Sequence, residues 1–239
     1  MLSDLLHGHF DQETLIELFA HLVIIFMILP LHELAHAWTA YKLGDDTASR
    51  QGRMTLNPIA HIDPIGAILL LLTGFGWAKP VPINPARFDR KHSMRFGVAI
   101  TALAGPLSNL IAAFIGMVAF RFYLLSDFFK RGLIDSYLSG GELNTALIIR
   151  LFFQFFIIVN IGLAVFNLIP IPPLDGSKIV GYFTPAKFDK WLIQNEQIIR
   201  MVFLIIVFSG ILSEPLSWVR DQIWDMFVFF TDWIPKIAG

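Results

Sequence analysis

Cysteine is missing from this chain of 239 residues, and charged residues make up only 15% of it. The absence of cysteine excludes disulfides and thiolate metal ligands, so any metal site must be built from histidine and carboxylate side chains. The formal net charge of -1 shows no basic excess of the kind that binds nucleic acid, and we set nucleic-acid binding aside. With 55% hydrophobic residues and a mean hydropathy of +0.63, the composition predicts an integral membrane protein.

Long polar blocks and internal repeats are also absent, so we expect one membrane-embedded domain over residues 1–239, with its core at 14–212. The predicted fold class is mostly α-helical, with about four transmembrane helices. The expected spans are a first helix of about 30 residues that begins near the capping-box pattern at Thr14 and ends near Gly44, then Gly97–Phe120, Ala146–Ile169 and Trp191–Leu212.

Two further segments are expected not to cross the membrane. The apolar stretch from Ile65 to Leu72 is too short for a span, which needs about 20 residues, and we expect it to be re-entrant. Prolines alternate with apolar residues in 77–88, which predicts an extended edge strand or a polyproline-like segment rather than a helix. Such an exposed edge could take a substrate chain by strand addition. Residues 213–239 combine tryptophans, phenylalanines and charges, which predicts an interfacial C-terminal helix.

The most informative motif is His32-Glu33-Leu34-Ala35-His36, because residues 18–31 before it offer no polar side chain except His21. Four residues of an α-helix turn through about 400°, so His32 and His36 share one face about 6 Å apart, where both can bind one zinc ion. Glu33 then lies beside the metal, where it can accept a proton from a water molecule that zinc activates. The alternative is a pair of hydrogen-bonded histidines with no metal, which the apolar setting disfavours.

A catalytic zinc usually takes three protein ligands, and Asp175 is the best candidate for the third. It follows three prolines that end the third expected span, a place where an aspartate without a cation is costly. The alternative is that Asp175 only caps the next segment. Asn167, at the end of the same span, can donate a hydrogen bond to developing negative charge, although a helix-packing asparagine is nearly as plausible.

These two motifs together resemble the site-2 protease family of intramembrane zinc metalloproteases, and the chain is similar to its short members without PDZ or CBS domains. The resemblance runs from about residue 31 to 181 and includes Gly52 to Pro58, His61 to Pro64, Pro80 to Phe88 and Ala104 to Asn109. It implies one Zn²⁺ on His32, His36 and Asp175, with Glu33 as general base and acid. It also implies that Asn167 polarises the scissile carbonyl or its oxyanion, and it assigns Asn109 and His61 no certain role.

The resemblance implies an intramembrane metalloendopeptidase that cleaves transmembrane proteins or peptides in or near their spans. A non-proteolytic zinc-binding membrane protein or a zinc carrier remains the alternative, and a membrane di-iron oxidase would need more histidine or glutamate ligands than this chain supplies. A carrier needs ligands but no base, so Glu33 favours the hydrolase. The oligomeric state is not indicated by any pattern in the sequence.

The lysines and arginines predict the orientation of a multi-pass protein in the cell membrane. Eleven are expected on one side (Lys42, Arg50, Arg53, Lys79, Arg87, Arg90, Lys91, Arg95, Lys178, Lys187 and Lys190), five on the other (Arg121, Lys130, Arg131, Arg220 and Lys236), and Arg150 and Arg200 within spans. By the positive-inside rule the richer side is cytoplasmic. The histidine motif lies at that same end of the first helix, so we expect the active site toward the cytoplasm.

Overall fold

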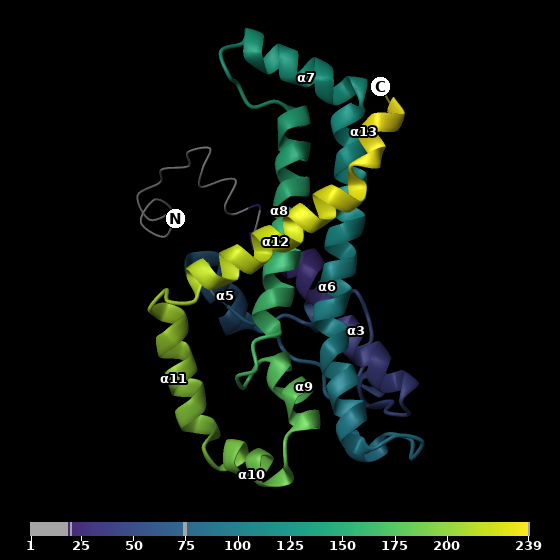
Figure 1. Cartoon of the computed structure of the whole chain (residues 1–239), viewed down its shortest axis with the longest axis vertical. Helices are drawn as coiled ribbons and strands as arrows, with labels where there is room; N and C mark the ends of the chain where they lie inside the picture. The colour runs from purple at the N-terminus through teal and green to yellow at the C-terminus, as the bar shows by residue number, and fades with distance from the viewer. Residues whose placement is uncertain (1–18, 20, 74–75, 239) are drawn as a thin grey trace.

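The computed structural model describes residues 19, 21–73 and 76–238, and most of them are helical (Figure 1). The elements in chain order are η1 (Ile24–Ile28), α3 (Leu29–Lys42), α4 (Thr47–Arg50), η2 (Pro58–Ala60), α5 (Pro64–Thr73), η3 (Pro85–Arg87), α6 (Met94–Leu125), α7 (Asp127–Leu138), α8 (Thr145–Asn167), α9 (Asp175–Phe183), α10 (Ala186–Gln194), α11 (Glu196–Phe208), α12 (Ser213–Thr231) and α13 (Trp233–Ala238). The capping-box pattern at Thr14 lies outside the described residues.

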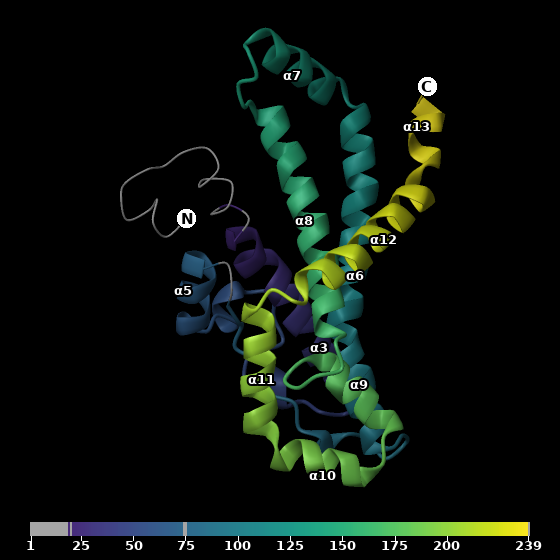
Figure 2. The ribbon, with the colours of Figure 1, turned by 60° about the vertical axis from the view of Figure 1, so that its left-hand side comes forward.

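Three helical stretches of the described chain are long and apolar enough to cross a membrane: His21–Lys42, Met94–Leu125 and Thr145–Asn167. They confirm the first three expected spans. The helices α6 and α8 run side by side for most of the height of the molecule, and α3 packs against the lower half of α6 (Figures 1 and 2). Ser93 and Asn144 begin α6 and α8, because their side chains accept hydrogen bonds from first-turn amides.

The first span changes its helical geometry just ahead of the histidine motif. Residues Ile24–Ile28 form a π-helical turn, and the N–H of Leu29 donates to the carbonyl of Ile24. Pro30 has no N–H for the usual bond four residues back, so the local hydrogen-bond register is disturbed at this point. Gly44 ends the helix with a φ of +101°, a conformation that favours glycine.

The edge strand expected over 77–88 does not form in the described residues. A single antiparallel bridge joins Ile62 to Ala78, and the chain beyond it is extended without a partner strand. Pro80 and Pro82 cannot donate to a β-ladder, which explains why no strand continues from the bridge. The expected edge strand is therefore not found in the described residues, whereas the non-helical backbone expected for this segment is present over 77–84.

Side chains satisfy the backbone of this extended segment instead. The Arg53 guanidinium donates to the carbonyls of Lys79, at 2.7 Å, and Pro80, at 3.2 Å. Buried Asp45 accepts a 2.6 Å hydrogen bond from the N–H of Asn84. These bonds hold the segment against the lower end of α3, next to the histidine motif.

The fourth expected span, Trp191–Leu212, is not one helix. Asn195 separates α10 from α11, and α11 has 13 residues, or about 20 Å at 1.5 Å per residue, which is shorter than the hydrocarbon layer. In the part of the chain that the structure describes, one further pair of helices, Glu196–Phe208 and Ser213–Ile237, is apolar and long enough when taken together, and its bend of 76° makes it a broken span or a re-entrant loop. The break lies at Gly210, whose φ is +74°.

The C-terminal helices pack on the spans. In Figure 1, α12 crosses α6 and α8 obliquely, and Phe227 of α12 joins a buried cluster with Met117, Phe120 and Ile157. The Arg121 guanidinium donates to the carbonyl of Val228 at 3.3 Å. The interfacial location expected for residues 213–239 stays a prediction, as does the division into a core and a tail.

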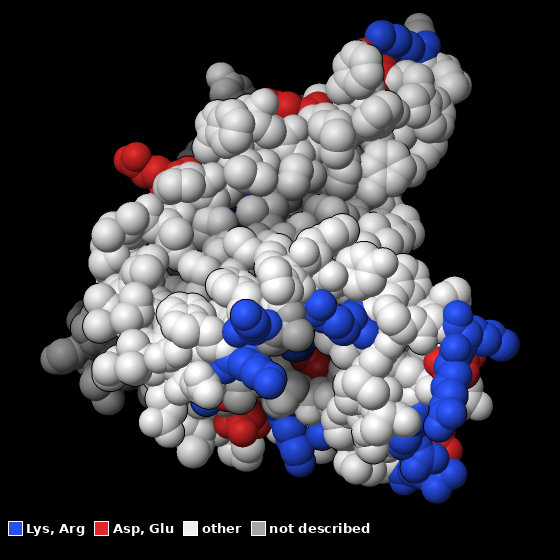
Figure 3. Space-filling model, turned by 60° about the horizontal axis from the view of Figure 1, so that its bottom comes forward, with Lys and Arg blue, Asp and Glu red and all other residues white. Residues whose placement is uncertain are grey.

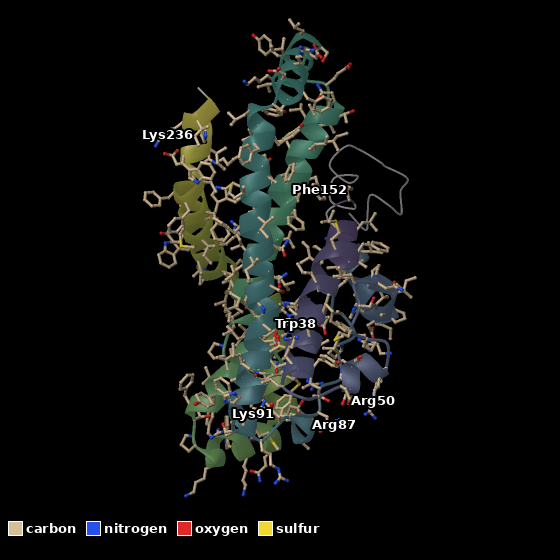
Figure 4. The ribbon with its side chains drawn as sticks, turned by 90° about the vertical axis from the view of Figure 1, so that its right-hand side faces the viewer. Trp38, Arg50, Arg87, Lys91, Phe152 and Lys236 are labelled. Atoms are coloured by element: carbon tan, nitrogen blue, oxygen red, sulfur yellow. The ribbon has the colours of Figure 1, made fainter. Side chains whose placement is uncertain are left out.

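The charged ends of the molecule differ. Lysine and arginine side chains gather on the lower face (Figure 3), and Figure 4 places Arg50, Arg87 and Lys91 at the lower end and Lys236 near the opposite end. The motif-bearing helix α3 also lies in this lower half (Figure 2). The site described next is therefore close to the basic end of the structure.

Candidate metal centre

Three buried side chains from two distant segments meet beside the first half of α3. His32 and His36 come from α3 and Asp175 is the first residue of α9, and among the described residues their ligand atoms form a group able to hold a metal ion, all within 4.8 Å of one another. The two Nε2 atoms are 3.0 Å apart. Oδ2 of Asp175 lies 3.2 Å from Nε2 of His32 and 3.1 Å from Nε2 of His36.

The hydrogen bonds behind the two imidazoles determine which nitrogen faces the group. Nδ1 of His36 is 2.7 Å from the carbonyl oxygen of Thr101, which can only accept, so this nitrogen carries the proton. Nδ1 of His32 is 2.6 Å from Oδ1 of Asn109 and donates to it. Each neutral ring thus has a lone pair on Nε2 facing the carboxylate.

This donor set fits zinc. Two imidazole lone pairs and a carboxylate oxygen repel one another at about 3 Å unless a cation lies between them. Ligands at about 2.0–2.1 Å from a tetrahedral zinc are about 3.3 Å apart, close to the spacings found. Two histidines one helical turn apart and a carboxylate from a distant segment are also a common ligand set of catalytic zinc sites. Such sites keep the fourth coordination position open for water or substrate.

Two glycines allow these close approaches. A Cβ built on Gly105 of α6 would overlap the His36 ring and lie 2.6 Å from Cε1 of His32. A Cβ on Gly176, directly after Asp175, would overlap the carbonyl oxygen of Leu168. Only glycine at these positions lets α6 pass behind the imidazoles and lets the proline-rich turn close onto the start of α9.

Lys178 supplies the nearest positive charge. Its Nζ donates to Oδ1 of Asp175 at 3.0 Å, while the other carboxylate oxygen, Oδ2, faces the histidines. The lysine side chain is about half exposed, so it reaches the buried carboxylate from the surface. It therefore orients Asp175 with one oxygen toward the imidazoles.

Glu33 is buried next to the two histidines, and one of its oxygens is fixed by the extended segment. Oε2 accepts a 2.8 Å hydrogen bond from the N–H of Val81. Val81 lies between Pro80 and Pro82, so it holds the only backbone N–H of these three residues. The carboxylate is thereby held in one orientation beside the metal-binding group.

The remaining candidates lie outside this group. Asn167 is the last residue of α8, half-buried, and its Nδ2 donates to the carbonyl of Leu163 one turn back, at 3.0 Å. The amide has a second N–H, and its proposed role toward substrate stays a prediction. His61 is buried in the turn before α5, where Nε2 donates to the carbonyl of Thr55 at 2.8 Å, so it supports the loop rather than the metal group.

Sequence reasoning missed the residues that support the site. Asn160, Thr101, Gly105 and Val81 act through buried hydrogen bonds or close packing. Asn160 was the most visible of them, because it is a polar residue in the apolar run of the third span. Gly105 and Val81 fall in segments that resemble the family, but nothing in the sequence indicates their roles or that of Thr101, because Thr101 and Val81 contribute backbone atoms and Gly105 only the absence of a side chain.

Comparisons with known proteins find relatives of this chain. The sequence model of Peptidase family M50 matches residues 20–210. A Bacillus subtilis (strain 168) protein named "Putative zinc metalloprotease YwhC" is 42% identical over 219 residues, which cover 89% of this chain and 93% of that protein. "Putative zinc metalloprotease Rip2" of Mycobacterium tuberculosis (strain H37Rv) is 28% identical over 188 residues, or 75% of this chain and 62% of that protein. No solved structure gives a significant match.

Proposed function

Because the chain belongs to peptidase family M50, the site-2 protease family, and is a zinc metallopeptidase, we propose that it hydrolyses peptide bonds in or near transmembrane segments of membrane proteins. Such cleavage is the chemical step of regulated intramembrane proteolysis. The observation that carries the proposal is the buried group of His32, His36 and Asp175 with Glu33 beside it, on a helix apolar and long enough to span a bilayer.

His32, His36 and Asp175 are the residues that would hold the metal. Zinc bound there supplies a Lewis acid that polarises the scissile carbonyl and acidifies the attacking water. Burial of all three ligands keeps bulk water out, so their charge and dipoles act at full strength on the reacting atoms.

Glu33 is the general base and then the general acid. With Oε2 held by the N–H of Val81, Oε1 is left to take a proton from the attacking water. The same carboxyl group returns this proton to the nitrogen of the leaving amine when the peptide C–N bond breaks. Asn167 has one amide N–H beyond its bond to Leu163, and that N–H is the donor we assign to the developing oxyanion.

Access to a peptide bond in a membrane helix requires local unwinding, because a helical carbonyl is shielded by its own turns. The extended chain at 79–84 lies beside Glu33 and is held by Arg53 and Asp45, which makes it the best surface to receive an unwound substrate. The short α5 before it is proposed to enter the membrane from the same side without crossing it.

The proposed location is the cell membrane, with the site toward the cytoplasm. Support comes from the basic lower end in Figures 3 and 4, which belongs to the same half of the molecule as α3 (Figure 2). Cytoplasmic ends of membrane helices carry the excess of lysine and arginine.

The deciding experiment uses Glu33→Gln. We expect the purified variant to retain about one zinc per chain while cleavage falls by about 10² to 10⁴-fold, because the ligands stay but the base is lost. Membrane-protein fragments released in cells that produce wild-type protein, Glu33→Gln or exposed Glu142→Gln would show the loss in the first variant only. Retained cleavage in Glu33→Gln would contradict the mechanism, and zinc flux into proteoliposomes without any cleavage would support the carrier instead.

A further inference from the structure

A chain of buried hydrogen bonds connects the metal-binding group to the third span. Asn160 of α8 is fully buried, and its Nδ2 donates to the carbonyl oxygen of Phe156 at 2.8 Å. Its Oδ1 accepts a 2.8 Å hydrogen bond from Nδ2 of Asn109 on α6, which is also fully buried. Oδ1 of Asn109 in turn lies 2.6 Å from Nδ1 of His32 on α3. Three helices thus contribute to one path of side-chain bonds.

The direction of this path is fixed at its far end. The Phe156 carbonyl can only accept, so the amide group of Asn160 nearest to it must be the NH₂. Oδ1 of Asn160 therefore faces Asn109 and requires a donor there, which leaves Oδ1 of Asn109 to face His32. An oxygen at that place requires an N–H on Nδ1 of His32 and so leaves Nε2 with its lone pair. A backbone carbonyl of α8 thus determines the tautomer of a histidine on α3.

We propose that Asn160 is a positioning residue of the metal centre: through Asn109 it sets the His32 tautomer and ring orientation, so that Nε2 is presented as a ligand. The inference rests on the proposed metal site. Outer partners of metal-binding histidines generally act in this way, by fixing which nitrogen is free and how the ring is turned. Here the partner of the histidine is itself held by a second amide one helix away.

The two histidines differ in how they are held. His36 donates directly to the backbone carbonyl of Thr101, a partner that α6 keeps in place whatever its side chains are. His32 depends on two side-chain amides, because it bonds to Asn109, which in turn bonds to Asn160. Both hydrogen bonds are buried where no water can replace them. The helix that carries Asn160 also leads into the turn that ends at Asp175. The helix α8 is therefore linked to His32 through hydrogen bonds and to Asp175 through the chain.

The test is a double-mutant cycle measured by zinc affinity. Full-length protein in detergent is prepared as wild type, Asn160→Leu, Asn109→Leu and the double variant, and zinc dissociation constants are measured by competition with a chelator. We expect Asn109→Leu to weaken zinc binding by about 10- to 100-fold and Asn160→Leu by about tenfold. In the Asn109→Leu background, Asn160→Leu should change the constant by less than about twofold, because the path is already broken.

Gln154→Leu is the matched control, since it removes another amide from α8 that has no place in the path. It should leave the zinc constant as in wild type. Thermal stability of each apo variant separates a packing defect from a metal effect: a purely structural role for Asn160 would lower stability and leave zinc affinity unchanged. If Asn160→Leu does not fold, Asn160→Gln keeps an amide but displaces it, and the proposal expects weaker zinc binding from this variant too.

The outcomes separate two failures. Wild-type protein that binds no zinc would overturn both the proposed function and this inference. Zinc binding that is equally tight in wild type and Asn160→Leu, or effects of the two substitutions that simply add, would overturn the inference alone. Coupled losses that Gln154→Leu does not share would establish it.

Discussion

The helices α6 and α8 are packed in two different ways along their length. In their middle, the buried residues of the shared cluster are Ala113, Met117 and Phe120 of α6 and Ile157 and Ile161 of α8, all apolar. One turn from Ala113 along α6, the buried residue is Asn109, bonded to Asn160 of α8. A single pair of helices therefore changes from apolar packing to directed hydrogen bonding within one turn.

The difference shows how a membrane helix pair provides both adhesion and a polar site. Apolar contacts between spans have no direction, and lipid tails can replace part of them, so their contribution comes from tight packing. Buried amides have direction, and each requires a particular partner. We therefore expect substitutions in the apolar middle to change stability alone, and substitutions in the polar part to change zinc binding or turnover.

The largest expected effect is that of Gly105→Ala. The new Cβ would overlap the His36 ring and lie 2.6 Å from Cε1 of His32, so the imidazoles must move. Zinc affinity should fall by about 100-fold, the upper end of the effect of disturbed outer partners, although alanine favours a helix over glycine by about 1 kcal/mol. Chelator competition measures the change.

Gly162→Ala is the control for this prediction, because a Cβ on Gly162 of α8 would meet no atom within 4 Å. It should leave zinc affinity unchanged and raise thermal stability slightly. Equal zinc dissociation constants for the two alanine variants would show that the close packing of Gly105 against the imidazoles does not affect zinc binding. That result would contradict the prediction.

The apolar middle is tested by Met117→Ala. Met117 of α6 is fully buried in a cluster with residues of α8 and α12. Its truncation should lower the free energy of unfolding by about 2 kcal/mol. This is the low end of such losses, because the solvent around membrane helices is lipid, which is as apolar as the side chain. The zinc dissociation constant of the folded fraction should stay within about twofold of wild type. A zinc constant that weakened along with stability would mean that the two parts are not independent.

Much of this organisation could be predicted from the sequence, for reasons visible in particular residues. Hydropathy identifies the spans because each must hide its backbone within one helix. Two histidines one turn apart define a shared face without any knowledge of the fold, and Asp175 stands out because an aspartate after an apolar span is costly without a cation. The structure brings these three residues together across 143 positions of sequence between His32 and Asp175.

Other features could not be predicted, because they depend on partners far along the chain. The expectation of a strand at 77–88 failed since its backbone bonds go to the side chains of Glu33, Asp45 and Arg53 rather than to another strand. The break inside the expected fourth span could not be predicted either, because hydropathy does not register the end of one helix and the start of the next at Asn195. The supporting role of Asn160 is set by Asn109, 51 positions away.

The smallest expected effect concerns the bond that holds the base. Val81→Pro removes the N–H that donates to Glu33 while keeping the extended backbone that the neighbouring prolines already favour. One hydrogen bond to a carboxylate then disappears, and we expect kcat to fall by about tenfold, or roughly 1.4 kcal/mol, with zinc content unchanged. Fragment release from a cleaved membrane protein and zinc analysis of the purified variant measure both quantities.

Val81→Ala separates this bond from packing, since it keeps the N–H but shortens a buried side chain that contacts Ala37 and Ala48. Val81→Ala should lower stability and leave kcat near the wild-type value, whereas Val81→Pro should lower kcat. If the two variants lost the same turnover, the apolar packing of Val81 against α3 would control turnover, and the hydrogen bond from its N–H to Glu33 would not. If only the proline variant lost turnover, a single backbone N–H between two prolines would be the element that orients the base.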